Sequence, residues 1–121
     1  MTRILLVEDD SDNLKLFTLI LENDGFDVDA YIDPDYAWLE FRPYYYDLLI
    51  LDYRMPNLNG LELYKRIVAL DKSVKAILLT ANYEQVDKNE IESIQRHTNL
   101  KVIKKPIAIP KLLDEVASIL N

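Results

Sequence analysis

Acidic, hydroxyl and basic side chains stand directly after short apolar runs at several points along the chain. Six of them could take part in chemistry: Glu8, Asp9, Asp10, Asp52, Thr80 and Lys105. A carboxylate can attack a phosphoryl group and form an acyl phosphate, but the two anions repel each other and cations must offset that repulsion. An ammonium group and Mg²⁺, which prefers oxygen ligands, could supply that positive charge.

Each of these residues also has an ordinary structural explanation. Acids after a strand commonly cap the next helix, a threonine that ends a strand reflects β-propensity, and a lysine before a proline is commonly solvated. The chemical interpretation therefore depends on whether the fold brings the six residues to one place.

The apolar pattern alternates between short runs and longer stretches with helical spacing, as in repeated strand and helix units. The expected strands are Arg3–Val7, Phe26–Tyr31, Asp47–Leu51, Val74–Thr80 and Leu100–Lys104. These repeats predict a doubly wound α/β domain, in which a parallel sheet lies between two layers of helices. Ligands bind such sheets at the carboxyl ends of the strands, and all six residues would lie there.

Helices are expected in the intervening stretches and at the end of the chain. The expected spans are Ser11 to about Gly25 with Ser11 or Asp10 as cap, Pro34–Phe41, Gly60–Leu70 with Asn59 as cap, about Glu84–His97, and Ile109–Leu120. The fourth span has few apolar residues beyond Val86, Ile91 and Ile94, which predicts low local stability and a capacity to shift.

Length and composition limit the classes of protein. The 121 residues suit one domain, taken as 1–121, and no apolar run approaches the ~18 residues that span a bilayer. A net charge of −7 argues against direct nucleic-acid contact, and the absence of cysteine excludes disulfides and thiolate metal sites. His97 is the single histidine, which excludes sites with two imidazoles. Without an export signal, we expect a soluble, cytoplasmic protein.

Five motifs resemble, in order and spacing, the receiver domain of two-component response regulators, the superfamily of chemotaxis-regulator-like proteins. They are LLVEDD at 5–10, LILDYRMP at 49–56, NG at 59–60, LTA at 79–81 and KKP at 104–106. The resemblance covers essentially the whole chain. It implies a flavodoxin-like fold with five parallel strands in the order 2-1-3-4-5 and five helices.

The resemblance also implies a role for each site residue. Asp52 would be the phosphoacceptor, with Mg²⁺ bound directly by Asp9 and Asp52, through water by Glu8, and by the backbone carbonyl of Arg54. The phosphoryl oxygens would meet three further residues: Thr80 as a hydrogen-bond donor, Ala81 as the small neighbour that leaves room, and Lys105 as a charge partner. Pro106 stands where the family has a strained peptide bond that directs the lysine. For Asp10 we favour a helix cap over a metal ligand.

The chain departs from the family pattern at its output side. Val102 stands where the family commonly has an aromatic residue that turns inward when the threonine moves, and a β-branched side chain cannot make that swing. The switch would then be read through backbone movement alone or with the help of Tyr83. The loop Arg96–Asn99 replaces the usual Gly-Ala turn, so partner choice should differ as well.

The favoured hypothesis is a signalling module rather than an enzyme that turns over a substrate. A histidine kinase or phosphotransfer protein would phosphorylate Asp52, and the fourth helix, fifth strand and fifth helix would then control an output domain or a partner. Dimerisation through that face stays open. One alternative is an interaction module that works without phosphorylation, against which the complete acid, threonine and lysine set argues. A phosphate-binding enzyme is disfavoured, because Gly25 and Gly60 are the only glycines and cannot form a Gly-rich loop.

Overall fold

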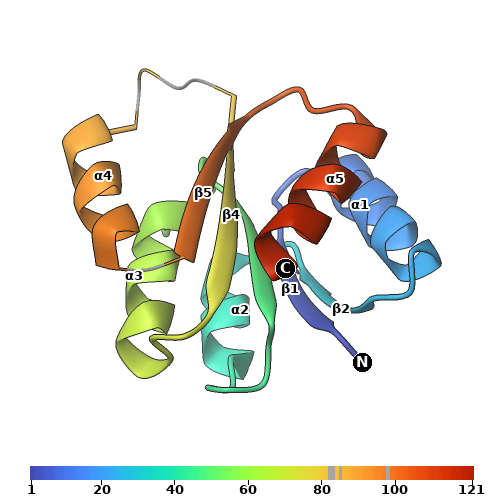
Figure 1. Cartoon of the computed structure of the whole chain (residues 1–121), viewed down its shortest axis with the longest axis horizontal. Helices are drawn as coiled ribbons and strands as arrows, with labels where there is room; N and C mark the ends of the chain where they lie inside the picture. The colour runs from blue at the N-terminus through green and yellow to red at the C-terminus, as the bar shows by residue number, and fades with distance from the viewer. Residues whose placement is uncertain (82–83, 85, 98) are drawn as a thin grey trace.

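The computed structural model describes residues 1–81, 84, 86–97 and 99–121, and Tyr83 lies outside them (Figure 1). Five parallel strands form one sheet in the order β2-β1-β3-β4-β5, which confirms the predicted fold and strand order. The strands are β1 (Arg3–Val7), β2 (Asp27–Tyr31), β3 (Leu48–Asp52), β4 (Lys75–Thr80) and β5 (Asn99–Lys104). The helices are α1 (Ser11–Asn23), α2 (Pro34–Glu40), α3 (Gly60–Leu70), α4 (Lys88–His97) and α5 (Ile109–Leu120).

Helices cover both faces of the sheet. Figure 1 shows α1 and α5 on one face and α2, α3 and α4 on the other. The central strand β3 is buried along its whole length, because alternate residues contact the two helical layers: Leu48 and Ile50 pack in the core beside α1 and α5, and Leu49 and Leu51 in the core beside α2, α3 and α4. This burial explains the uninterrupted apolar sequence of β3.

Five strand boundaries differ by one residue from those expected: four strands start at Asp27, Leu48, Lys75 and Asn99 rather than at Phe26, Asp47, Val74 and Leu100, and β3 also ends one residue later. Phe26 was expected to start β2, but its N–H donates to the carbonyl of Leu21 at 3.1 Å and so belongs to the turn that ends α1. Asp47 was expected to start β3, but it precedes the strand, and its carboxylate accepts from the N–H of Arg3 at 2.9 Å. At its other end β3 includes Asp52 as its last residue, because Asp52 still pairs with Leu79 of β4.

Helix α4 begins at Lys88 rather than near Glu84. Asp87 caps it, since one carboxylate oxygen accepts from the N–H groups of Asn89 at 3.0 Å and Glu90 at 3.3 Å. Buried Val86 and Ile91 fix the helix against the sheet, and an ion pair joins Glu90 to Lys65 of α3. The low local stability of this helix stays a prediction.

Three consecutive tyrosines, Tyr44 to Tyr46, precede β3, and two of them pack against other side chains. Tyr46 is buried and its hydroxyl donates to Asp29 at 2.6 Å, and burial followed by this bond raises its pKa. The guanidinium groups of Arg3 and Arg42 both lie over the ring of Tyr45, at 4.3 and 3.8 Å from the ring centre. Tyr44 is 76% exposed and takes no part in this packing.

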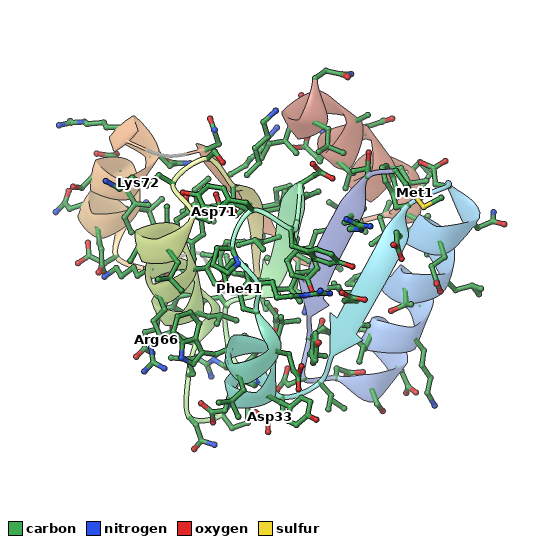
Figure 2. The ribbon with its side chains drawn as sticks, turned by 90° about the horizontal axis from the view of Figure 1, so that it is seen from below. Met1, Asp33, Phe41, Arg66, Asp71 and Lys72 are labelled. Carbon is green, nitrogen blue, oxygen red and sulfur yellow. The ribbon has the colours of Figure 1, made fainter. Side chains whose placement is uncertain are left out.

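Asp71, which ends α3, is a buried carboxylate at the edge where the strands begin (Figure 2). One oxygen accepts from the N–H of Tyr44 at 2.9 Å, and the other accepts from the N–H and the hydroxyl of Ser73, at 3.2 and 2.9 Å. These bonds join the connection before β3 to the connection before β4. Within the described part of the chain, no helix has the length and apolar character needed to cross a membrane.

Candidate metal centre

The predicted site residues meet at the carboxyl edge of the sheet because all five strands run in parallel. Strand β1 leads into Glu8 and Asp9, β3 and β4 end on Asp52 and Thr80, and β5 leads into Lys105. A cavity of about 420 Å³ lies at this edge, and its lining is Glu8, Asp9, Asp10, Asn13, Asp52, Tyr53, Arg54, Thr80, Ala81 and Lys105. The convergence expected from the sequence is thus present in the structure.

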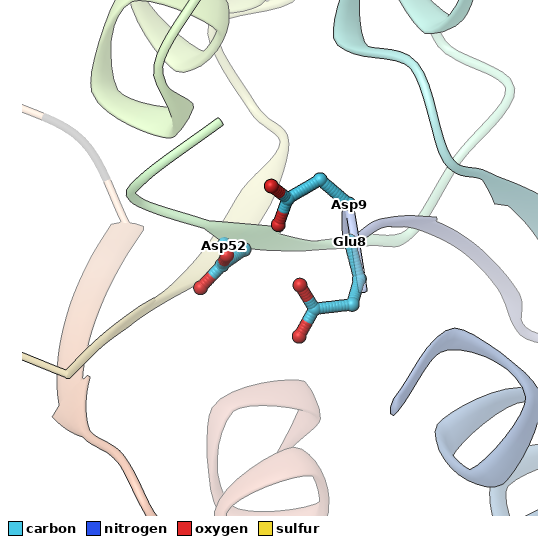
Figure 3. Close-up of side chains that lie close together, drawn as sticks. All are labelled: Glu8, Asp9 and Asp52. Atoms are coloured by element: carbon cyan, nitrogen blue, oxygen red, sulfur yellow. The ribbon is translucent and has the colours of Figure 1, made fainter. Parts of the chain in front are cut away.

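Three carboxylates form the centre of this cavity. Glu8, Asp9 and Asp52 each offer one oxygen, and the three oxygens lie within 4.8 Å of one another (Figure 3). Glu8 is 1% exposed and Asp52 is 7% exposed, whereas Asp9 is open to solvent. A cluster made of carboxylate oxygens alone, with one side open, suits a hard divalent cation that keeps some of its water.

Lys105 joins the two buried acids. Its ammonium group donates to Glu8 Oε1 at 2.9 Å and to Asp52 Oδ1 at 3.0 Å. Its own N–H donates to the carbonyl of Thr80 at 2.8 Å, so the backbone of the lysine is tied to the end of β4. The peptide bond between Lys105 and Pro106 is cis. The pairing of Lys105 with Glu8 was not anticipated from the sequence, where the two residues are 97 positions apart.

Charge crowding changes the ionisation of the site. Burial, followed by repulsion from Glu8, raises the pKa of Asp52 to about 7, although the bond from Lys105 acts in the opposite direction. Burial alone would lower the pKa of Lys105, but its hydrogen bonds to Glu8 and Asp52 outweigh that effect and raise it. The site therefore has more negative charge than one ammonium group can balance.

Asp10 lines the cavity but acts as the cap of α1. Its Oδ1 accepts from the N–H groups of Asp12 at 2.9 Å and Asn13 at 3.1 Å, as expected for a helix cap. Its own N–H donates to Glu8 Oε2 at 3.4 Å. Asn13 and Tyr53 also line the cavity, but neither was predicted from the sequence as a site residue. The position of Asn13 in the first turn of α1, close to the acids that follow β1, was a signal that could have identified it.

Three of the remaining predicted residues line this cavity: Arg54, Thr80 and Ala81. Thr80 is 2% exposed, whereas Arg54 and Ala81 are exposed residues. Val102 is half-buried and packs against the core beside α3 and α4, outside the cavity lining. Tyr83 lies outside the described residues, so its expected part in the switch is not tested.

The sequence profile of the response regulator receiver domain matches residues 4–117. The response regulator ArlR of Staphylococcus aureus is 32% identical over 121 residues, which are 100% of this chain and 53% of ArlR. The chain thus spans about half the length of the curated relatives it matches.

The similar solved structures also include response regulator proteins. The non-phosphorylated receiver domain of HemR from Leptospira biflexa is 28% identical with a TM-score of 0.87, covering 100% of this chain and 95% of that one. A structure of histidine kinase ThkA in complex with response regulator protein TrrA contains a chain that is 29% identical with a TM-score of 0.81, covering 100% of both chains.

Proposed function

The chain belongs to the response regulator receiver domains of two-component signalling systems, and from that membership we propose that Asp52 accepts a phosphoryl group in a Mg²⁺-dependent reaction. The observation that carries the proposal is the position of Asp52: a buried carboxylate at the end of β3, 3.0 Å from the ammonium group of Lys105 and beside two further acids. The chemistry is modification of the domain itself rather than turnover of a small substrate.

The residues present fit a magnesium ion. The donor set consists of oxygens, and burial followed by repulsion from Glu8 raises the pKa of Asp52, so a bound cation would favour its ionised form. We assign direct ligation to Asp9 and Asp52, ligation through water to Glu8, and a further ligand to the carbonyl oxygen of Arg54. When bound, the ion supplies charge neutralisation for the approaching phosphoryl oxygens.

The chain's own residues then perform the transfer. A carboxylate oxygen of Asp52 forms a bond to the phosphorus of a phosphohistidine, the phosphorus–nitrogen bond breaks, and its electron pair returns to the imidazole. Lys105 remains beside Asp52 and pairs with a phosphoryl oxygen. The hydroxyl of Thr80 donates to another, and the small side chain of Ala81 leaves room for the group.

We infer the donor and the reader of this switch from the family. A histidine kinase or a histidine phosphotransfer protein is the proposed donor, in line with the solved complex of histidine kinase ThkA with its response regulator. The proposed reader is an output domain or partner on the face formed by α4, β5 and α5, with a dimer through the same face as a further arrangement. Residues 1–121 would form a single, cytoplasmic receiver domain that makes no direct contact with nucleic acid or membrane.

A second candidate function is an interaction module that keeps the fold and signals without phosphorylation. Val102 favours it, because this residue cannot make the inward swing of an aromatic ring that the family commonly uses. The complete set of Asp9, Asp52, Thr80 and Lys105 around one cavity favours phosphorylation instead.

A small phosphodonor separates the two functions. The protein is incubated with acetyl phosphate, with and without Mg²⁺, and its intact mass is compared with that of Asp52→Asn. Asp10→Asn is the matched control, because asparagine also caps helices and the residue lines the same cavity. We expect Mg²⁺-dependent phosphorylation of the wild type and of Asp10→Asn but not of Asp52→Asn. An unmodified wild type, or equal modification of Asp52→Asn, would rule the proposal out.

A further inference from the structure

Gly60 begins α3 directly against the end of β3. The connection between them folds back on itself, since the N–H of Gly60 donates to the carbonyl of Tyr53 at 2.8 Å. Asn59 and Glu62 form a reciprocal capping box that fixes the first turn of the helix. The start of α3 and the end of β3 are thus held together within eight residues of chain.

The space at Gly60 is smaller than a methyl group. A Cβ atom there would lie 2.3 Å from the backbone oxygen of Asp52, 3.0 Å from its carbonyl carbon and 2.7 Å from Cδ1 of Leu78. Non-bonded carbon contacts are normally about 3.5–4.0 Å, so one side of this contact must move if a side chain is added. The nearest atom is backbone, which cannot rotate away as a side chain can.

The two sides of this contact, the start of α3 and the end of β3, are each fixed by further contacts. Helix α3 is anchored by its capping box and by buried Leu61 and Leu63. On the other side, the N–H of Tyr53 donates to the carbonyl of Leu79 at 2.7 Å, which binds the end of β3 to β4. Because neither partner can withdraw freely, an added methyl group would strain the short connection between them, which carries Asp52 at its start and Arg54 within it.

We propose that Gly60 is a positioning residue for the metal centre: its missing side chain lets α3 set the place of the Asp52 carboxylate and of the Arg54 carbonyl. This inference rests on the proposed function, because both groups are proposed ligands of Mg²⁺. Glu8 and Asp9 follow β1 and do not depend on this contact. Adding a methyl group should move one half of the ligand set relative to the other.

The test is the Mg²⁺ affinity of folded Gly60→Ala, measured by titration calorimetry well below its melting temperature. We expect about 10- to 100-fold weaker binding, as is usual when a group that orients a ligand is disturbed. Gly25→Ala is the matched control, because Gly25 has a φ of +95° with no atom within 4 Å of an added Cβ. That variant should melt earlier yet bind Mg²⁺ as the wild type does.

A second variant guards against poor folding of the first. Leu78→Val removes Cδ1 and so relieves the side-chain part of the contact, while the encounter with the Asp52 backbone remains. The double variant Gly60→Ala, Leu78→Val should still bind Mg²⁺ weakly, whereas Leu78→Val alone should bind normally. Wild-type affinity in either folded Gly60→Ala protein would overturn the inference. Absence of Mg²⁺ binding by the wild type would instead overturn the proposed function.

Discussion

Replacing Asp52 with asparagine should stabilise the protein in the absence of divalent cations. The pKa of Asp52 is about 7 in the fold and 3.8 in its ordinary state. At about 1.4 kcal/mol for each factor of ten in the ionisation constant, the fold disfavours the ionised carboxylate by about 4 kcal/mol. Asparagine keeps the shape and removes the charge.

The gain should be smaller than that upper value. Asp52 lines a cavity that exposed Asp9 and Arg54 also line, and water there screens part of the charge on the carboxylate. We therefore expect roughly half, about 2 kcal/mol, at pH 8. For a chain of this length that corresponds to a melting temperature higher by roughly 6–10 °C.

The pH dependence gives a sharper check. Below pH 4 Asp52 is protonated in both the folded and the unfolded chain, so the variant gains nothing. Between pH 4 and 7 the unfolded chain loses the proton first, and the wild type becomes progressively less stable than the variant. Above pH 7 the difference should be constant.

Thermal and urea denaturation with a chelator present, from pH 4.5 to 8.5, would measure this difference. Asp71→Asn serves as the contrasting control, because the carboxylate of Asp71 accepts three hydrogen bonds and its replacement should cost about 1–3 kcal/mol. A variant Asp52→Asn that is no more stable than the wild type at pH 8, or whose advantage does not change with pH, would refute the reasoning.

Two further substitutions test the remaining charges. Lys105→Met should strengthen Mg²⁺ binding by about 10-fold in calorimetry, because the ammonium group no longer competes for Glu8 and Asp52; unchanged or weaker binding would contradict this. Asp10→Ala should lower the free energy of unfolding by about 1 kcal/mol through loss of the α1 cap, while leaving Mg²⁺ affinity within about two-fold. A large loss of Mg²⁺ affinity in that variant would make Asp10 a ligand.

The fold was predictable from the sequence because its main signal is local. Buried strands such as β3 require uninterrupted apolar residues, and the parallel arrangement then brings Asp52 and Thr80 to one edge. Strand ends were less predictable, because they depend on contacts between distant residues. The position of Asp47 before β3, for example, depends on its hydrogen bond with Arg3. The start of α4 could have been predicted locally, because Asp87 is a typical helix cap. It was missed because the prediction relied on the apolar pattern alone.

The electrostatics of the site depend on distances that no local pattern contains. Lys105 was expected to meet a phosphoryl group, but its bond to Glu8 depends on how the ends of β1 and β5 lie in the folded sheet. The raised pKa of Asp52 depends on burial and on the nearness of Glu8, both of which arise on folding. Gly60 was visible as a residue at a helix start, whereas its contact with the Asp52 backbone was not.

Asp71 and Asp52 are both buried, and the difference in their partners predicts which of them an electrophile would modify. The oxygen electron pairs of Asp71 point at three donors, two of them backbone N–H groups, so they are engaged in holding two loops together. Asp52 shares a single ammonium group with Glu8 and lines a cavity. The proposed phosphorylation would therefore select Asp52 through the availability of its electron pairs, and we expect a small phosphodonor to reach it without a recognition surface.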